Sequence, residues 1–161
     1  MRAFVLSLIA GLFFVPCFAG CNSVSNATTS DQDTTSANID MKKFAGIWTL
    51  VSGEVDGTPL PEQDVKNSTL TIIGDAYTVQ LSDLGVKKGI QKLDPTKAPK
   101  QIDAHDASGP TVGYNLGIYE FAPNGDLRVC FGAPGKERPT EFVTKPGSGH
   151  FMHLWRRAEA N

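Results

Sequence analysis

Short apolar runs alternate with polar residues from residue 42 onward, and glycines and prolines separate these runs. Leu70 and Ile72 alternate with threonines, and Tyr77 and Val79 follow the same pattern after a Gly-Asp pair. Alternation with a period of two is typical of strands that bury one face. This part of the chain shows no long segment with the helical period of about 3.6, so the pattern predicts an all-β domain.

The strongest local signal is the segment Pro123-Asn124-Gly125-Asp126. Asn-Gly accepts the positive φ angles of a type I′ turn, so it predicts a hairpin with arms at 113–122 and 126–132. Gly- and Pro-rich turns bound two further strand candidates, at 140–145 and 150–157. Strands at this spacing, with almost no helix, predict a small antiparallel up-and-down barrel of about eight strands.

The N-terminus has the features of an export signal. Arg2 supplies a positive charge, and 3–18 is apolar apart from two residues, a length below the roughly 20 residues of a spanning helix. The sequence Phe18-Ala19-Gly20-Cys21 resembles a bacterial lipobox. This resemblance implies that Cys21 is lipidated and anchors the protein in a membrane of the bacterial cell envelope, facing the periplasm or the exterior. The alternative is cleavage after Ala19 by ordinary signal peptidase, which would release a secreted protein.

These features divide the chain into a signal peptide at 1–20, a tether at 21–40 and a barrel at 41–161. The tether lacks Lys, Arg and aromatic residues after its cysteine and cannot bury enough apolar surface to fold, so we expect it to be disordered. Of the 15 basic and 17 acidic residues, Arg2 and three tether aspartates lie outside the barrel segment, which leaves 14 of each. A neutral barrel lacks the basic surface that binding to nucleic acid requires.

The start of the barrel segment, Gly46-Ile47-Trp48, resembles the G-x-W motif that opens lipocalin-type barrels. The resemblance implies that an arginine near the last strand covers the tryptophan and closes one end of the barrel. Two candidates, Arg156 and Arg157, lie in the expected region. Alternation from Met152 and Leu154 puts Arg156 on the inward face, so we predict that Arg156 stacks on Trp48.

Four further segments, in order along the chain, resemble an uncharacterised bacterial family of lipocalin-like secreted proteins and lipoproteins. Together with the G-x-W motif they cover nearly all of 44–157. The resemblance implies a barrel fold and a location in the cell envelope, and it brings no catalytic residues with it. The segments are 93–103 (LDPTKAPKQID), 117–120 (GIYE), 127–130 (LRVC) and 138–142 (RPTEF).

The metal-ligating side chains do not form a recognisable site in the sequence. His150 and His153 lie three residues apart in a predicted strand, where they would face opposite sides. Asp103, His105 and Asp106 are grouped, but they supply too few ligands on one face, and a solvated loop is the better interpretation. We therefore expect no metal.

Nucleophilic catalysis is not indicated either. Cys130 has no local helix N-terminus or metal motif that would lower the pKa of its thiol. The segment Gly147-Ser148-Gly149 is not the G-x-S-x-G elbow of hydrolases, and no phosphate-binding glycine motif occurs. We expect a protein that is not an enzyme and uses no cofactor.

Two functions fit a barrel of this size. The first is binding of a small, largely apolar ligand inside the barrel, and the second is an interaction or structural module with a filled barrel. The first requires a void among the inward-facing side chains, although most of the predicted ones are large and Gly117 falls on the outward face. The predicted inward positions are Leu50, Leu70, Ile72, Tyr77, Val79, Leu116, Ile118, Leu127, Val129, Phe131 and Leu154.

Overall fold

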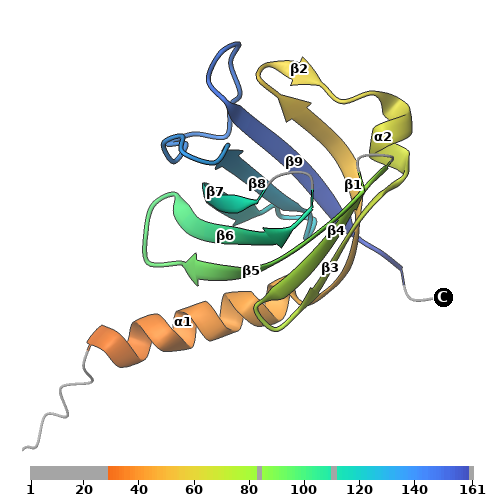
Figure 1. The fold of residues 1–161 in the computed structure, drawn as a ribbon. Helices are drawn as coiled ribbons and strands as arrows, with labels where there is room; N and C mark the ends of the chain where they lie inside the picture. The colour runs from red at the N-terminus through yellow and green to blue at the C-terminus, as the bar shows by residue number, and fades with distance from the viewer. Residues whose placement is uncertain (1–28, 83–84, 110–111, 160–161) are drawn as a thin grey trace, which may run out of the picture.

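A computed structural model describes residues 29–82, 85–109 and 112–159 (Figure 1). The signal peptide, Cys21 and the start of the tether lie outside the described residues. None of the described helices is long and apolar enough to cross a membrane. In chain order the elements are α1 (Thr29–Phe44), β1 (Gly46–Val55), β2 (Thr58–Pro59), α2 (Glu62–Lys66), β3 (Ser68–Ile73), β4 (Ala76–Leu81), β5 (Val86–Asp94), β6 (Lys100–Ser108), β7 (Gly113–Phe121), β8 (Leu127–Gly132) and β9 (His150–Arg157).

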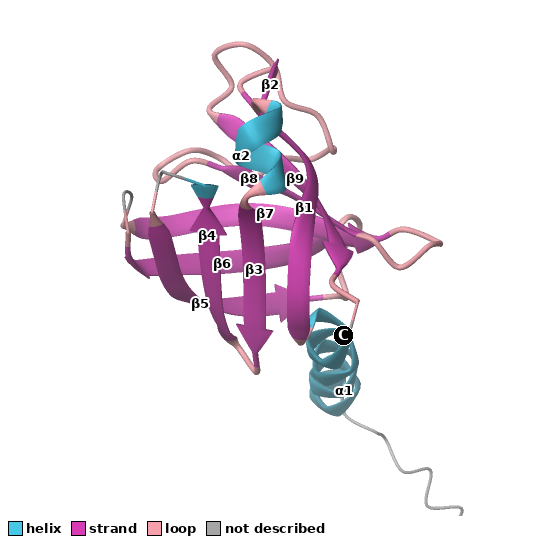
Figure 2. Cartoon of the chain, turned by 90° about the vertical axis from the view of Figure 1, so that its right-hand side faces the viewer, coloured by secondary structure: helices cyan, strands magenta, loops and turns pink. Residues whose placement is uncertain are grey.

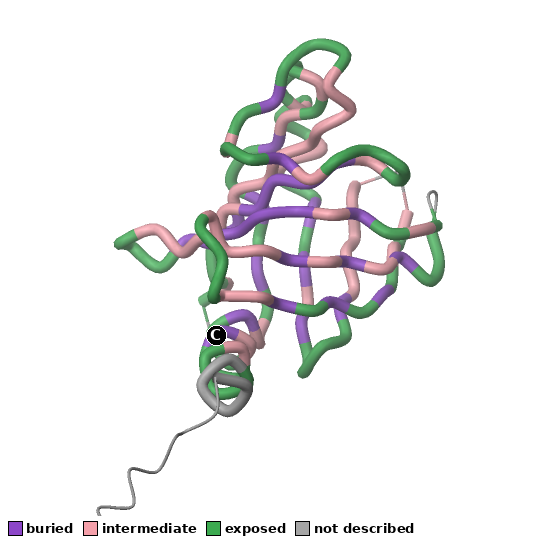
Figure 3. The backbone as a smooth tube through the Cα atoms, turned by 90° about the vertical axis from the view of Figure 1, so that its left-hand side faces the viewer, coloured by how far each residue is buried: buried purple, intermediate pink, exposed green. Residues whose placement is uncertain are grey.

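Eight strands form a closed antiparallel barrel, which confirms the predicted fold class. β1 pairs with β3, each later strand pairs with the next, and β9 pairs back with β1. The short strand β2 pairs with the end of β1. Buried positions alternate with more exposed ones along β5 and β6 (Figure 3), as expected for strands with one face inside a barrel.

The hairpin around Asn124 forms as predicted, but its turn differs. Of the loop residues 123–125, Gly125 alone has a positive φ angle, +86°. The Gly125 N–H donates to the carbonyl of Ala122 over 2.8 Å. The Ala122 N–H donates to the carbonyl of Asp126, so the loop has three residues instead of the two of a type I′ turn. Pro123, with its fixed φ, favours this three-residue form with glycine in the last position.

The predicted strand at 140–145 is wrong. The segment 133–149, between β8 and β9, is mostly irregular and follows the outside of the barrel. The Thr144 hydroxyl accepts a hydrogen bond from the Gly57 N–H over 3.0 Å and donates one to Glu54. These side-chain bonds attach the segment to the β1–β2 turn in place of a strand pairing.

The alternation along β9 is also opposite to the prediction. Phe151, His153 and Trp155 line the interior, so Leu154 and Arg156 face outward. An error of one residue in the alternation moves every side chain of the strand to the opposite face of the sheet. Neighbouring residues from His150 to Leu154 are all half-buried, and for this reason the apolar pattern alone did not define the inner face.

On β7 the predicted inward residues Leu116 and Ile118 likewise face outward, because Asn115 lines the interior. Ile118 is nevertheless buried. It pairs with Cys130 on β8, and segment 133–149 covers this part of the outer face, with the carbonyl of Val143 lying 3.9 Å from the Cys130 sulfur. Both faces of β7 and β8 therefore carry buried apolar residues.

Trp48 and Arg157 close one end of the barrel. The Trp48 side chain is 1% exposed, and its indole N–H donates to the Phe44 carbonyl over 2.8 Å. The Arg157 guanidinium lies 4.3 Å from the centre of the Trp48 ring and donates to the carbonyls of Lys43 and Ala45. Glycine suits position 46 because its φ angle is +132°, which residues with a side chain rarely adopt. A Cβ there would also lie 2.4 Å from a guanidinium nitrogen of Arg157, which would have to move.

The predicted contact of Arg156 with Trp48 is therefore corrected to Arg157. Arg156 faces outward and forms two hydrogen bonds with the carboxylate of Asp126, over 3.0 and 2.8 Å. Its side chain remains 58% exposed. The arginine implied by the lipocalin resemblance is present, one residue further along the strand.

Replacing Arg157 by alanine should lower the free energy of unfolding by about 1–2 kcal/mol, because stacking on Trp48 and two bonds to carbonyls are lost. Arg156→Ala should cost less, since the Arg156 side chain is 58% exposed and solvent screens its attraction to Asp126. Urea unfolding of both variants measures the two values. A larger loss for Arg156→Ala would contradict the assignment of the closing arginine.

Helix α1 covers the same end of the barrel, and α2 lies at the opposite end (Figure 2). The prediction of a disordered tether up to residue 40 is wrong for 34–40, which are helical. The Asp40 side chain is buried and accepts hydrogen bonds from Tyr119 over 2.8 Å and from Lys100 over 2.6 Å. These contacts with β7 and β6 fix a helix whose own sequence is polar, so its apolar pattern gave no signal.

Candidate functional site: the barrel cavity

The barrel encloses a cavity of about 310 Å³. This volume lies in the range of a few hundred Å³ that is typical of small-molecule sites. The residues that line the cavity run from the buried Phe44 at the closed end of the barrel to Leu60 and Asp64 at the other end. Figure 2 shows α2 at that other end. Val55, Leu60 and Pro134 line the cavity at that end, and Val55 is exposed, so we take this end as the mouth.

The wall of the cavity is mostly apolar. Six of the predicted inward residues line it: Leu70, Ile72, Tyr77, Val79, Val129 and Phe131. Leu50 and Leu127 are buried in the adjoining core and do not line the cavity. Leu116, Ile118 and Leu154 are excluded from the wall by the reversed alternation described above.

Two glycines explain how large rings and a cavity fit in one small barrel. Contrary to the prediction, Gly117 lies on the inward face, where a Cβ would be 2.3 Å from the ring of Phe131. A Cβ at Gly89 would be 2.4 Å from the Tyr77 hydroxyl. Because these positions lack side chains, both rings lie close against the wall and leave the centre of the barrel open.

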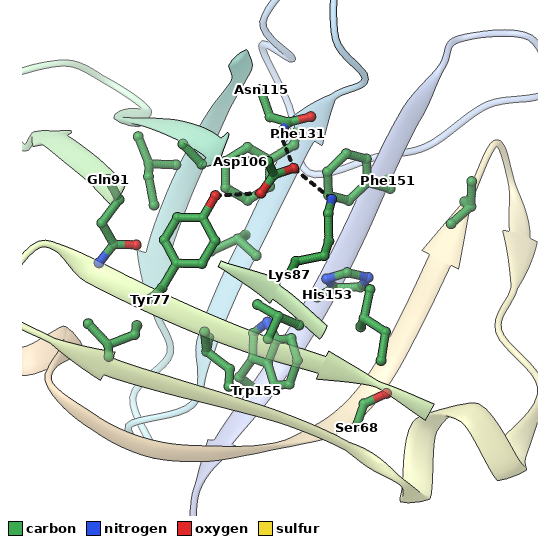
Figure 4. Close-up of a pocket in the computed structure, with 18 of the residues that line it drawn as sticks. Ser68, Tyr77, Lys87, Gln91, Asp106, Asn115, Phe131, Phe151, His153 and Trp155 are labelled. Atoms are coloured by element: carbon green, nitrogen blue, oxygen red, sulfur yellow. Dashed lines mark hydrogen bonds and ion pairs between the residues drawn. The ribbon is translucent and has the colours of Figure 1, made fainter. Parts of the chain in front are cut away.

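Four polar side chains from neighbouring strands meet at one side of the wall, and we call them the Asp106 cluster (Figure 4). Asp106 is 3% exposed. Its carboxylate accepts hydrogen bonds from the hydroxyl of Tyr77 over 2.5 Å and from the amide of Asn115 over 2.9 Å. The Lys87 ammonium lies 2.7 Å from the same carboxylate. β4, β5, β6 and β7 each contribute one member.

Burial and neighbouring charges set the protonation of two further groups on the wall. Burial, together with the adjacent Asp106 carboxylate, raises the pKa of Tyr77, so its hydroxyl stays protonated and continues to donate. Burial, assisted by the charge of Lys87, lowers the pKa of His153 to about 4. His153 is therefore uncharged at neutral pH. The His153 side chain is half-buried and lines the cavity.

The sequence grouped Asp103, His105 and Asp106 correctly but placed them in a solvated loop, and that placement is wrong. All three lie on β6, where alternation separates them. Asp103 is paired with Arg138 and His105 stacks on Tyr114, both away from the cavity. Only Asp106 faces inward. The alternation of Ile102, Ala104 and Asp106 was the available signal for this strand.

Lys87 and His153 were not expected in an interior site. Lys87 follows a polar turn region in the sequence, and His153 lies between Met152 and Leu154, which the predicted alternation placed on the inward face. Among the described residues no group of three or more His, Cys, Asp or Glu side chains comes together as a metal site. Burial raises the pKa of the Cys130 thiol to about 11, and this thiol lies outside the cavity wall.

Comparison with protein-family models, with curated proteins and with solved structures finds no match to the chain. A mostly apolar cavity with one cluster of paired polar groups can hold an apolar molecule and orient a polar end of it.

Proposed function

We propose that this protein is a non-enzymatic lipoprotein of the bacterial cell envelope whose lipocalin-like barrel binds a small, largely apolar ligand. The observation that carries the proposal is the cavity of about 310 Å³ with its mostly apolar wall. An interaction module with a filled barrel, the alternative from the sequence, would not need this space. The closure of the barrel by Trp48 and Arg157 supports the lipocalin resemblance on which the class of protein rests.

The pairing of the interior polar groups supports a binding role over catalysis. Asp106 is engaged by three donors of the protein itself, so most of its hydrogen-bonding capacity holds the wall together. Among the hydrogen bonds of the described residues there is no Ser–His or Cys–His side-chain pair that would activate a nucleophile. Within the part of the chain that the structure describes, the one cysteine, Cys130, lies outside the cavity.

Filling the cavity should abolish ligand binding. An uncharged, environment-sensitive naphthalene dye should bind the wild-type protein with an affinity on the order of micromolar, and small amphiphiles should displace it. Val129→Trp places an indole on the cavity wall and should remove dye binding while the β-sheet circular dichroism is retained. The measurement is a fluorescence titration.

Ile90→Trp is the matched control, because Ile90 lies on the outward face of β5 and is 53% exposed. This variant should bind the dye as the wild type does. If the wild type binds no dye and no amphiphile changes its melting temperature, the binding function is refuted. Equal loss of binding in both variants would locate the dye outside the cavity.

Lipidation is tested at Cys21. Cys21→Ser should remove acylation and release the protein from the membrane fraction, because the thiol is the group that carries the lipid. Metabolic labelling with a radioactive fatty acid, followed by fractionation, measures both effects. An unlabelled wild-type chain that begins at Gly20 would refute the anchor and leave the secreted alternative.

A further inference from the structure

We propose that the ligand of the barrel is an uncharged amphiphile whose hydroxyl or amide head group meets Lys87 and Asp106, with its apolar part along the rest of the cavity. This inference rests on the proposed binding function and specifies the chemical class of the ligand. Among the described residues that line the cavity, Lys87 and Asp106 form the one ion pair, on a wall that is otherwise mostly apolar.

The Asp106 cluster has hydrogen-bonding capacity left over. A lysine ammonium has three N–H donors, and among the described residues Asp106 is the single ion-pair partner of Lys87. A carboxylate has about four lone-pair sites, and Asp106 uses three of them. A hydroxyl or amide head group both accepts and donates, so it can bond to Lys87 and to Asp106 at once.

The charges of the cluster are already balanced. A carboxylate head group would bring a second negative charge close to Asp106, and an ammonium would do the same beside Lys87. An additional unpaired charge in an apolar cavity is costly. His153 lies near Lys87 and is uncharged at neutral pH, so it supplies no compensation. Asp64 also lines the cavity, but it lies on α2 at the mouth, where solvent screens its charge.

The size of the cavity fits a short amphiphile. At about 30 Å³ for each water-sized group, the volume of about 310 Å³ holds roughly ten such groups. The eight-carbon series 1-octanol, octanoate and octylammonium therefore provides three head groups on one chain of suitable length.

The experiment measures the dissociation constants of these three compounds by displacement of the dye at neutral pH. The wild type should bind octanol at least tenfold more tightly than either ion. Because octanol is also the most apolar of the three, the decisive comparison is between variants. Asp106→Asn leaves Lys87 unpaired and should raise the affinity for octanoate relative to octanol at least tenfold. Lys87→Gln leaves Asp106 unpaired and should do the same for octylammonium.

Two further variants complete the design. The double variant Lys87→Gln/Asp106→Asn removes both charges and should return the ranking to the wild-type order, and it provides a readout if either single variant melts below the assay temperature. Arg128→Gln removes a charge from the outer face, where Arg128 pairs with Glu120, and should leave the ranking unchanged.

Tighter binding of octanoate or octylammonium by the wild type would overturn the inference, as would single variants with an unchanged ranking. In both cases the barrel would still bind apolar ligands, and the proposed function would stand. If neither the dye nor any of the three compounds binds, the proposed function fails, and the inference fails with it.

Discussion

Replacing Trp48 by alanine is expected to lower the free energy of unfolding by about 3–5 kcal/mol, the range for deletion of a buried aromatic side chain. Trp48 is 1% exposed and lies at the closed end of the barrel. The deletion also leaves the Phe44 carbonyl without its indole donor and the Arg157 guanidinium without the ring beneath it. Helix α1, strand β1 and strand β9, which meet at this end of the barrel, therefore lose a shared contact.

Urea unfolding followed by circular dichroism measures this loss, with Ile47→Ala as the matched control. Ile47 is the next residue on β1, faces outward and is 56% exposed, so its truncation should have a small effect. Equal losses in the two variants would contradict the role assigned to Trp48.

Asp40→Ala is expected to cost about 2–3 kcal/mol, because a buried hydroxyl and an ammonium lose their shared acceptor. Tyr119 is fully buried, and its hydroxyl donates to Asp40. Lys100 is 40% exposed, so it can recover part of its solvation, and the loss should stay below that of a fully buried ion pair. Asn38→Ala, at an exposed position of the same helix, is the control. An equally small effect of both substitutions, by urea unfolding, would show that α1 is not fixed through Asp40.

The contribution of Asp40 should depend on pH. Burial alone would raise the pKa of this carboxyl, but hydrogen bonds from Lys100 and Tyr119 and the charge of Lys100 outweigh burial and hold the pKa below its ordinary value. The carboxylate thus stabilises the folded state fully above its ordinary pKa of 3.8, and this stabilisation is lost as the pH falls through the lower folded pKa. The stability difference between wild type and Asp40→Asn should be constant from neutral pH down to about pH 5 and should narrow below about pH 4. A difference that widens on acidification would contradict the direction of the shift.

Sequence alternation predicted the barrel well where one face of a strand is solvated. On β3 and β4 the predicted inward residues Leu70, Ile72 and Val79 line the cavity. On β7 segment 133–149 covers part of the outer face, so Ile118 is buried outside the barrel. When both faces are buried, alternation cannot define which one is inside. This physical reason accounts for the reversed assignment of Leu116 and Ile118.

The polar part of the candidate site could not be predicted, because its residues are distant in the sequence and become neighbours only when the strands pair. Lys87 and Asp106 look like surface residues in the sequence, and the register of β5 with β6 brings them together. The end of α1 is a similar case. Its polar residues give no apolar stripe, and the partners that bury Asp40 lie 60 and 79 positions away along the chain.

The most direct test of the binding function is a nuclear magnetic resonance titration of the wild-type protein with 1-octanol. The methyl groups of Leu70, Val79 and Val129, all on the cavity wall, should show saturable chemical-shift changes. The methyl groups of Ile73 and Ile90, which are exposed on the outside, should not change. Changes confined to the cavity residues would support binding inside the barrel. An unchanged spectrum at saturating octanol, or changes confined to the outer face, would contradict it.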